Sequence, residues 1–74
     1  MSKTTTVYVL EWETEGTSGF DWMPTKEGLE RIEKYTRDSG LVITRTYTLE
    51  VNASTDLHTI TEQVREHYEK KGTL

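Results

Sequence analysis

A chain of 74 residues with a hydrophobic fraction of 32% has the size of one domain, residues 1–74, with a thin core. It has no cysteine, which excludes disulfides and thiolate metal sites, and no apolar run exceeds four residues, which excludes a membrane-spanning helix. The formal net charge of −4 argues against a general nucleic-acid binder. Without cysteines or the apolar core of a signal peptide, a cytoplasmic protein is expected.

The first predicted element is a strand over residues 4–13, rich in β-branched and aromatic residues. Alternation along a strand divides its apolar side chains between two faces. One face carries Tyr8, Leu10 and Trp12, and the other carries Val7, Val9 and Glu11. Because both faces are apolar near the middle, we expect this strand to be covered on both sides for part of its length.

Residues 14–24 follow as a loop or a short hairpin, since Gly16 and Gly19 bracket small polar residues. A helix is then predicted over residues 26–38, with apolar residues at helical spacing. Thr25 is suited to cap its first turn, and Gly40 to end it in the left-handed conformation.

A second long strand is predicted over residues 41–51. One face is expected to be core and the other, a row of threonines, to face water or a partner. The core face contains Leu41, Ile43, Tyr47, Leu49 and Val51, interrupted by Arg45. A second helix is predicted over residues 56–71, capped by Ser54 or Asp56. Its apolar stripe contains Leu57, Ile60, Val64 and Tyr68.

This order predicts a small α+β or α/β fold, a two-layer β-α-β-α sandwich. A strand–helix–strand unit closes right-handed with parallel strands, which would place both helices on one face of the sheet. Two strands alone make a poor sheet. Either residues 17–22 add a short third strand, or a second copy of the chain supplies strands at an open edge as a homodimer. A single core cluster is expected, formed by Leu10, Leu29, Ile32, Ile43, Tyr47, Leu49, Leu57, Ile60 and Val64.

No catalytic or metal-binding pattern stands out, and neither a metal nor a cofactor is expected. His58 and His67 lie nine residues apart on one helix, so they point to opposite sides. Glu11 and Glu13 share a strand face beside a turn, which favours a solvated rim over a tuned acid–base pair. The Gly-rich stretch at residues 15–20 lacks the lysine of a phosphate loop. We therefore expect a protein that is not an enzyme.

The segment 11–24 is the strongest candidate for a binding site. It holds both tryptophans and four of the thirteen acids, and the nine acids elsewhere balance the nine Lys and Arg. Aromatic anchors surrounded by polar groups are typical of binding patches, and carboxylates steer such a patch toward a basic partner. The candidate partner-binding residues are Glu11, Glu13, Glu15, Phe20, Asp21 and Trp22. Trp12 is expected in the core.

These observations predict a non-enzymatic protein-interaction module, a small regulator or inhibitor such as those that phages and other mobile elements carry. It would act through segment 11–24 or an open strand edge, on another protein with a basic surface. The alternatives are a structural homo-oligomer that completes its own sheet and a weak nucleic-acid binder that uses the basic residues of its helices. On both helices these bases alternate with acids, which is typical of a solvated helix face. Nucleic acid is therefore the less favoured partner, and no membrane contact is expected.

Overall fold

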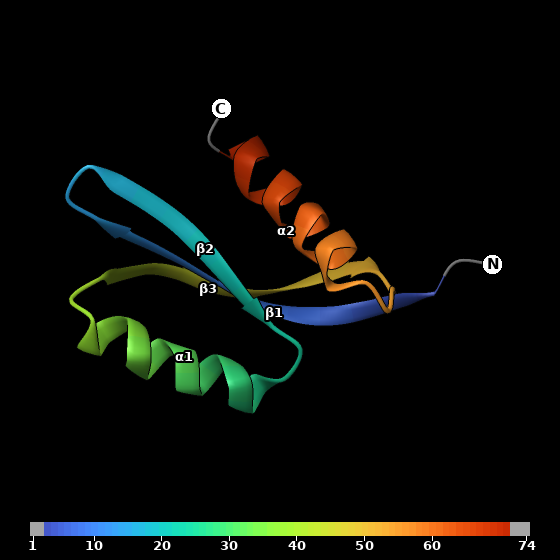
Figure 1. Cartoon of the computed structure of the whole chain (residues 1–74), viewed down its shortest axis with the longest axis horizontal. Coiled ribbons are helices and arrows are strands. Elements are labelled where there is room, and N and C mark those ends of the chain that lie inside the picture. Colours follow the sequence, from blue (N-terminus) through green and yellow to red (C-terminus); the bar gives the residue numbers. More distant parts are fainter. Residues whose placement is uncertain (1–2, 72–74) are drawn as a thin grey trace.

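The computed structural model describes residues 3–71, which form three strands and two helices (Figure 1). In chain order these are β1 (Thr4–Thr14), β2 (Thr17–Met23), α1 (Lys26–Asp38), β3 (Val42–Asn52) and α2 (Leu57–Lys71). The predicted α+β class and helix–sheet sandwich are confirmed, as is a third strand in the segment after Gly16. The sequence of this segment fits a loop as well as a strand, because Gly19 interrupts it and Gly16 precedes it.

The sheet has the order β2-β1-β3, and β1 is antiparallel to both of its neighbours. The prediction that the two long strands are parallel is therefore wrong. The hairpin between β1 and β2 reverses the chain before α1 begins, so the helical crossover joins β2 to β3. These two strands are parallel to each other and lie on either side of β1. The crossover predicted for the helix exists, but it starts one strand later than expected.

The two helices cover opposite faces of the sheet, and Figure 1 shows the sheet between them. The predicted placement of both helices on one face is wrong. Opposite residues in an antiparallel pair share a face, so Val9 lies beside Trp22 and Tyr47 on the side of α2. Met23, paired with Tyr8, packs beside Gly28 of α1 on the other side. The apolar character of both faces of β1, recognised from the sequence, is the signal for this arrangement.

The core is divided by the sheet, so the prediction of one cluster is wrong. The cluster under α2 contains Val7, Val9, Val51, Ile60 and Val64, with Phe20, Trp22, Tyr47 and Leu49 packed against it. Leu10 and Leu29 are buried outside this cluster, on the side of α1. Leu57, also expected in the core, is the first residue of α2 and is 65% exposed.

A β-bulge explains why Ile43 does not share the face of Tyr47. Glu11 lies opposite Arg45, but the next residue of β1, Trp12, lies opposite Ile43. One extra residue of β3, Thr44, is accommodated at this point, and an inserted residue reverses the alternation of the strand beyond it. The threonines of β3 at positions 44, 46 and 48 are exposed, as the prediction of a solvated face requires.

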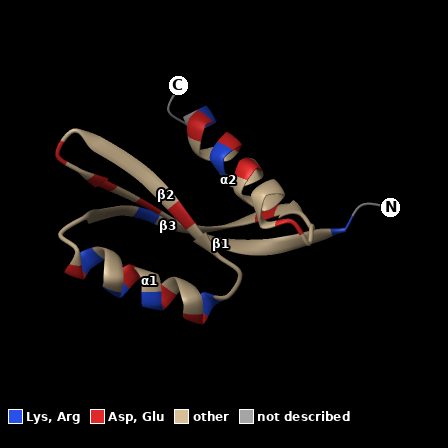
Figure 2. Cartoon of the chain, viewed as in Figure 1, with Lys and Arg blue, Asp and Glu red and all other residues tan. Residues whose placement is uncertain are grey.

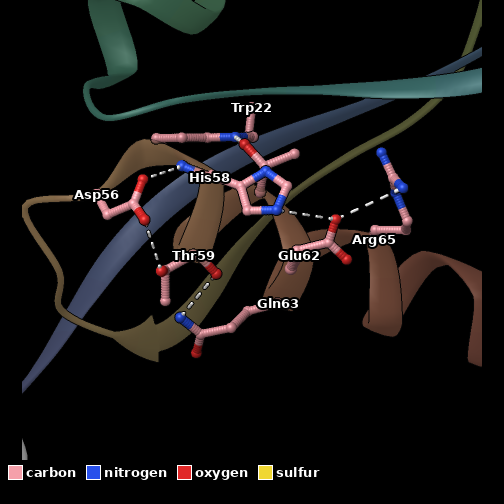
Figure 3. A network of polar contacts seen from close by, with 8 residues as sticks. Trp22, Asp56, His58, Thr59, Glu62, Gln63 and Arg65 are labelled. Atoms are coloured by element: carbon pink, nitrogen blue, oxygen red, sulfur yellow. Dashed lines mark hydrogen bonds and ion pairs between the residues drawn. The ribbon is translucent and has the colours of Figure 1, made fainter.

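The helix boundaries follow the predicted signals. The Thr25 hydroxyl accepts a hydrogen bond from the Gly28 amide at 3.0 Å, and Gly40 adopts a left-handed φ of 86° after α1. Asp56 caps α2, since its carboxylate accepts from the His58 amide and the Thr59 hydroxyl (Figure 3). Within residues 3–71, neither helix has the length and apolar character needed to cross a membrane.

Candidate functional site: the β1–β2 hairpin

The predicted binding segment forms the β1–β2 hairpin and its outer edge. Thr14 pairs with Thr17, and Gly16 takes the left-handed position of the two-residue turn with a φ of 81°. Glu13 and Glu15 are exposed near this turn, where Figure 2 shows acidic residues without basic ones on the ribbon. No Lys or Arg occurs in the sequence between Lys3 and Lys26, so the hairpin itself offers these acids no cation.

The sheet separates the predicted site residues onto two faces. Glu11 lies opposite Phe20, so both face α2 together with Glu13 and Trp22. Asp21 lies opposite Leu10 and faces the side of α1. The six residues are therefore close together along one hairpin, but only five of them lie on α2's side or at the turn. Spacing in the sequence could not show this, because residues 17–22 fit a loop as well as a short strand.

Glu11 is buried, with 5% of its surface exposed, which corrects its placement on a solvated rim. Its carboxylate accepts a hydrogen bond of 2.6 Å from the Tyr47 hydroxyl of β3. Burial, together with the bond to Glu11 and its charge, raises the pKa of the Tyr47 phenol well above its usual value. Arg45 lies opposite Glu11, and its guanidinium stands 5.1 Å from the centre of the Tyr47 ring. Glu11 is thus part of a polar contact inside the sandwich.

Phe20 and Trp22 are partly exposed and partly covered by α2. The Phe20 ring lies 5.2 Å from the ring of Tyr68, whose hydroxyl is 2.9 Å from the Ser18 hydroxyl. The indole N–H of Trp22 donates to the Thr61 hydroxyl at 2.9 Å. Both aromatic side chains therefore contribute to packing, which leaves only part of each ring accessible to a partner.

Trp12 lies over the opposite face of the hairpin, across Gly19. A Cβ atom at position 19 would stand 2.4 Å from Cζ2 of the Trp12 ring, so the ring occupies the space that any other residue would need. The Trp12 side chain also hydrogen-bonds Asp21. Burial raises the pKa of the Asp21 carboxyl, and the bond from Trp12 offsets part of this effect. Trp12 thus anchors Asp21 at the edge of the sheet.

The raised pKa of Asp21 makes stability depend on pH with a defined sign. Between the unfolded pKa near 3.8 and the higher folded value, the folded state binds more protons, so stability falls as the pH rises. Above this window the charged Asp21 destabilises the fold. We expect Asp21→Asn, which keeps an acceptor for Trp12, to be more stable than the wild type at pH 7. Urea midpoints measured from pH 3 to pH 7 should show a smaller decline for the variant. An equal decline would contradict the assignment.

The outer edge of β2 presents backbone groups that have no partner within residues 3–71. The Ala53 amide donates to the Lys3 carbonyl at 2.9 Å, which shows that odd-numbered residues of β1 direct their backbone groups toward β3. Because the direction of the backbone groups alternates along a strand, the even-numbered residues of β1 direct theirs toward β2. Their hydrogen-bonded partners in β2 are the residues at positions 17, 19, 21 and 23. The backbone groups of Ser18, Phe20 and Trp22 therefore point outward, away from the sheet.

A groove of about 480 Å³ runs along this edge. Residues of β2 form one wall, with Trp12 behind them, and α2 contributes Thr61, Arg65, Tyr68 and Glu69. Sequence reasoning missed these four residues of α2. Tyr68 was assigned to the apolar stripe of its helix, and nothing in the chain indicated that this stripe would meet the end of the hairpin. Among the described residues of the lining, Arg65 is the one that is basic, and its Nη1 atom lies 3.5 Å from Oε1 of Glu62.

The metal-ligating side chains of the described residues do not gather at the hairpin. Among residues 3–71, no group of three or more His, Asp or Glu side chains is placed to hold a metal ion. His58 lies near Glu62, whereas the His67 ring lies 5.5 Å from the Tyr47 ring, so the two histidines do not meet. No protein-family model, curated protein or solved structure matches the chain.

Proposed function

We propose that the chain is a non-enzymatic protein-interaction module, a small regulator or inhibitor, that binds a basic partner protein along the outer edge of β2. The observation that carries this proposal is the row of outward backbone groups on Ser18, Phe20 and Trp22, which borders the groove under α2. An extended segment of the partner can pair with such an edge through main-chain hydrogen bonds, while the groove accepts alternate side chains.

The charges of the hairpin support a basic partner. Glu13 and Glu15 are exposed beside the groove, and Asp21 lines it. Exposed charges at the rim of an interface act mainly on the rate of association, whereas the desolvated contacts at its centre act on the rate of dissociation. In this arrangement the acids attract a strand rich in Lys or Arg. The partly exposed rings of Phe20 and Trp22 then hold it.

The proposal is tested with peptides, because the edge is expected to bind extended segments rich in Lys or Arg. Random peptides displayed on phage are selected on the immobilised chain, and bound peptides are mapped by NMR. We expect selected peptides to be rich in basic residues and to shift the amides of Ser18, Phe20 and Trp22. A selection that converges on neutral peptides bound at another surface would contradict the proposal.

Two variants separate the backbone edge from the charges. In Ser18→Pro the outward amide is lost, but the hydrogen bonds from β2 to β1 remain, because the Ser18 amide does not point toward β1. Peptide binding should be lost, whereas Ser18→Ala, which lacks only the contact to Tyr68, should still bind. Charge reversal at Glu13 and Glu15 should slow association about ten-fold at low salt and weaken its salt dependence. Unchanged association by this variant would remove the steering role of the acids.

A further inference from the structure

The other edge of the sheet, on β3, is closed at one end by a side chain. The Asn52 amide donates to the Gln63 side-chain oxygen at 2.7 Å, and the Gln63 amide nitrogen donates to the Asn52 carbonyl at 3.0 Å. Both backbone groups of Asn52 therefore point away from β1, toward the outside of the sheet. The Gln63 side chain pairs with them as a neighbouring strand would.

The same direction recurs at every second residue of β3 until the bulge. Because backbone direction alternates, the amides and carbonyls of Thr46, Thr48 and Glu50 also point outward. Their outward groups have no hydrogen-bond partner among residues 3–71. This stretch also lacks proline and lysine, which protect exposed edges in other proteins. A stretch of β3 is therefore ready to pair with another strand.

We propose that a second copy of the chain occupies this edge, with the two β3 strands antiparallel about a two-fold axis at Tyr47. Thr46 then lies opposite Thr48 of the partner subunit, and the two Tyr47 side chains are neighbours on the face of α2. This register places Asn52, already satisfied by Gln63, at the end of the interface. Two three-stranded sheets become one sheet of six strands, with β2 at both outer edges.

The two halves of β3 lie beside grooves of opposite formal charge. The first half of β3 and α1 line a groove of about 490 Å³ that contains Arg37, Arg45 and Glu33. The second half of β3 and α2 line a groove of about 270 Å³, which contains Glu50, Glu66, Lys70 and His67. Counting only Lys, Arg, Asp and Glu, the formal charge is positive by one in the first half and negative by one in the second. An antiparallel two-fold axis brings each half against the opposite half of the other copy.

The faces of the sheet also agree with this pairing. Glu50 hydrogen-bonds the Thr6 hydroxyl on the face of α1, which is the face where Arg37 lies beside Thr44 and Thr46. Arg45 lies on the face of α2 with Tyr47, as does Glu66 beside Leu49. A two-fold axis perpendicular to the sheet keeps each face on its own side. Arg37 therefore meets Glu50 of the partner subunit, and Arg45 approaches Glu66 of the partner subunit.

Thr48→Pro tests the edge without disturbing the ladder between β3 and β1. The Thr48 amide points outward and its side chain is exposed, so proline removes a hydrogen bond only to the second copy. In sedimentation velocity over a concentration series, we expect the wild type and Thr48→Ala to reach the dimer mass and Thr48→Pro to remain monomeric. A wild type that stays monomeric up to millimolar concentration overturns the proposal, as does a dimeric Thr48→Pro.

Cysteine cross-linking tests the register, because the natural chain has no cysteine. Thr46→Cys and Thr48→Cys are prepared separately, oxidised alone and then oxidised as an equimolar mixture. Opposite residues of a hydrogen-bonded pair lie about 5.5 Å apart between Cα atoms, within the range of a disulfide. The mixture should form covalent dimers faster than either variant alone. Equal rates in all three samples, or none in the mixture, would overturn the register.

A charge exchange gives a third readout that does not depend on proline. Arg37→Glu alone should weaken dimerisation, because two glutamates then meet across the interface. Adding Glu50→Arg to the same chain should restore it, since the ion pair is rebuilt with opposite polarity. Failure of the double variant to recover would contradict the predicted contact. Ser18→Pro should leave the mass of the dimer unchanged, which separates this interface from the partner site on β2.

Discussion

Replacement of Ile60 by alanine should unfold a large part of the protein population. Ile60 is 6% exposed and belongs to the cluster with Val7, Val9, Val51 and Val64. Truncation of a buried Ile to Ala costs about 2–5 kcal/mol, because apolar transfer energy is lost and a cavity remains. Whole domains are stable by only about 5–15 kcal/mol, and a short chain lies toward the lower end. Urea denaturation followed by circular dichroism measures the loss.

Leu57 provides the matched control within the same helix. It is 65% exposed, so Leu57→Ala removes as many carbon atoms as Ile60→Ala but little buried surface. The free energy of unfolding should change by less than about 0.5 kcal/mol, as for most surface substitutions. If both variants lost similar stability, α2 would pack through a different face. That outcome would also place the groove beside β2 in doubt, since Thr61 and Tyr68 follow from the orientation of the same helix.

Gly19→Ala should be the second most damaging substitution, although it adds a single methyl group. That group would stand 2.4 Å from Cζ2 of Trp12, closer than two carbon atoms can approach. The indole must move, and Trp12 is held in place by its hydrogen bond to Asp21. Overpacking of this kind costs about 1–3 kcal/mol. For a domain of this size, the melting temperature should fall by roughly 4–8 °C per kcal/mol.

A double-mutant cycle assigns this cost to the Trp12 ring. In a Trp12→Leu background the space over position 19 is open, so Gly19→Ala should lose much less stability than in the wild type. The difference between the two backgrounds is the coupling energy between the residues. A cost that is the same in both backgrounds would mean that residue 19 is sensitive through its backbone rather than through the ring.

Local signals in the sequence were sufficient for most elements. The span of α1 was predicted to the residue, because Thr25, the apolar spacing that includes Leu29, and Gly40 all agree on its limits. The strands β1 and β3 were found from their β-branched residues. For β2 the evidence was divided, since Gly19 weakens a strand while Phe20 and Trp22 favour one. The sequence did not show that Trp12 of the neighbouring strand covers Gly19.

The candidate site, too, was only partly predictable from the sequence. The concentration of acids and aromatics between Glu11 and Trp22 was evident from the order of residues alone. The burial of Glu11 was not, because it depends on a hydroxyl of Tyr47, 36 positions away. The participation of Tyr68 was also hidden, since its apolar stripe indicated that one side of α2 is buried but not which strand it meets.

The sequence by itself determined the two helices and the strands β1 and β3, where α1 and α2 begin, and where the negative charge is concentrated. These properties depend on residues within a few positions of one another. Only the tertiary structure decided that β1 lies between β2 and β3, that the helices cover opposite faces, and that backbone groups at Ser18 and Thr48 face outward. Each of these depends on pairing between distant strands, and a shift of one residue or the bulge at Thr44 exchanges the two faces of a strand.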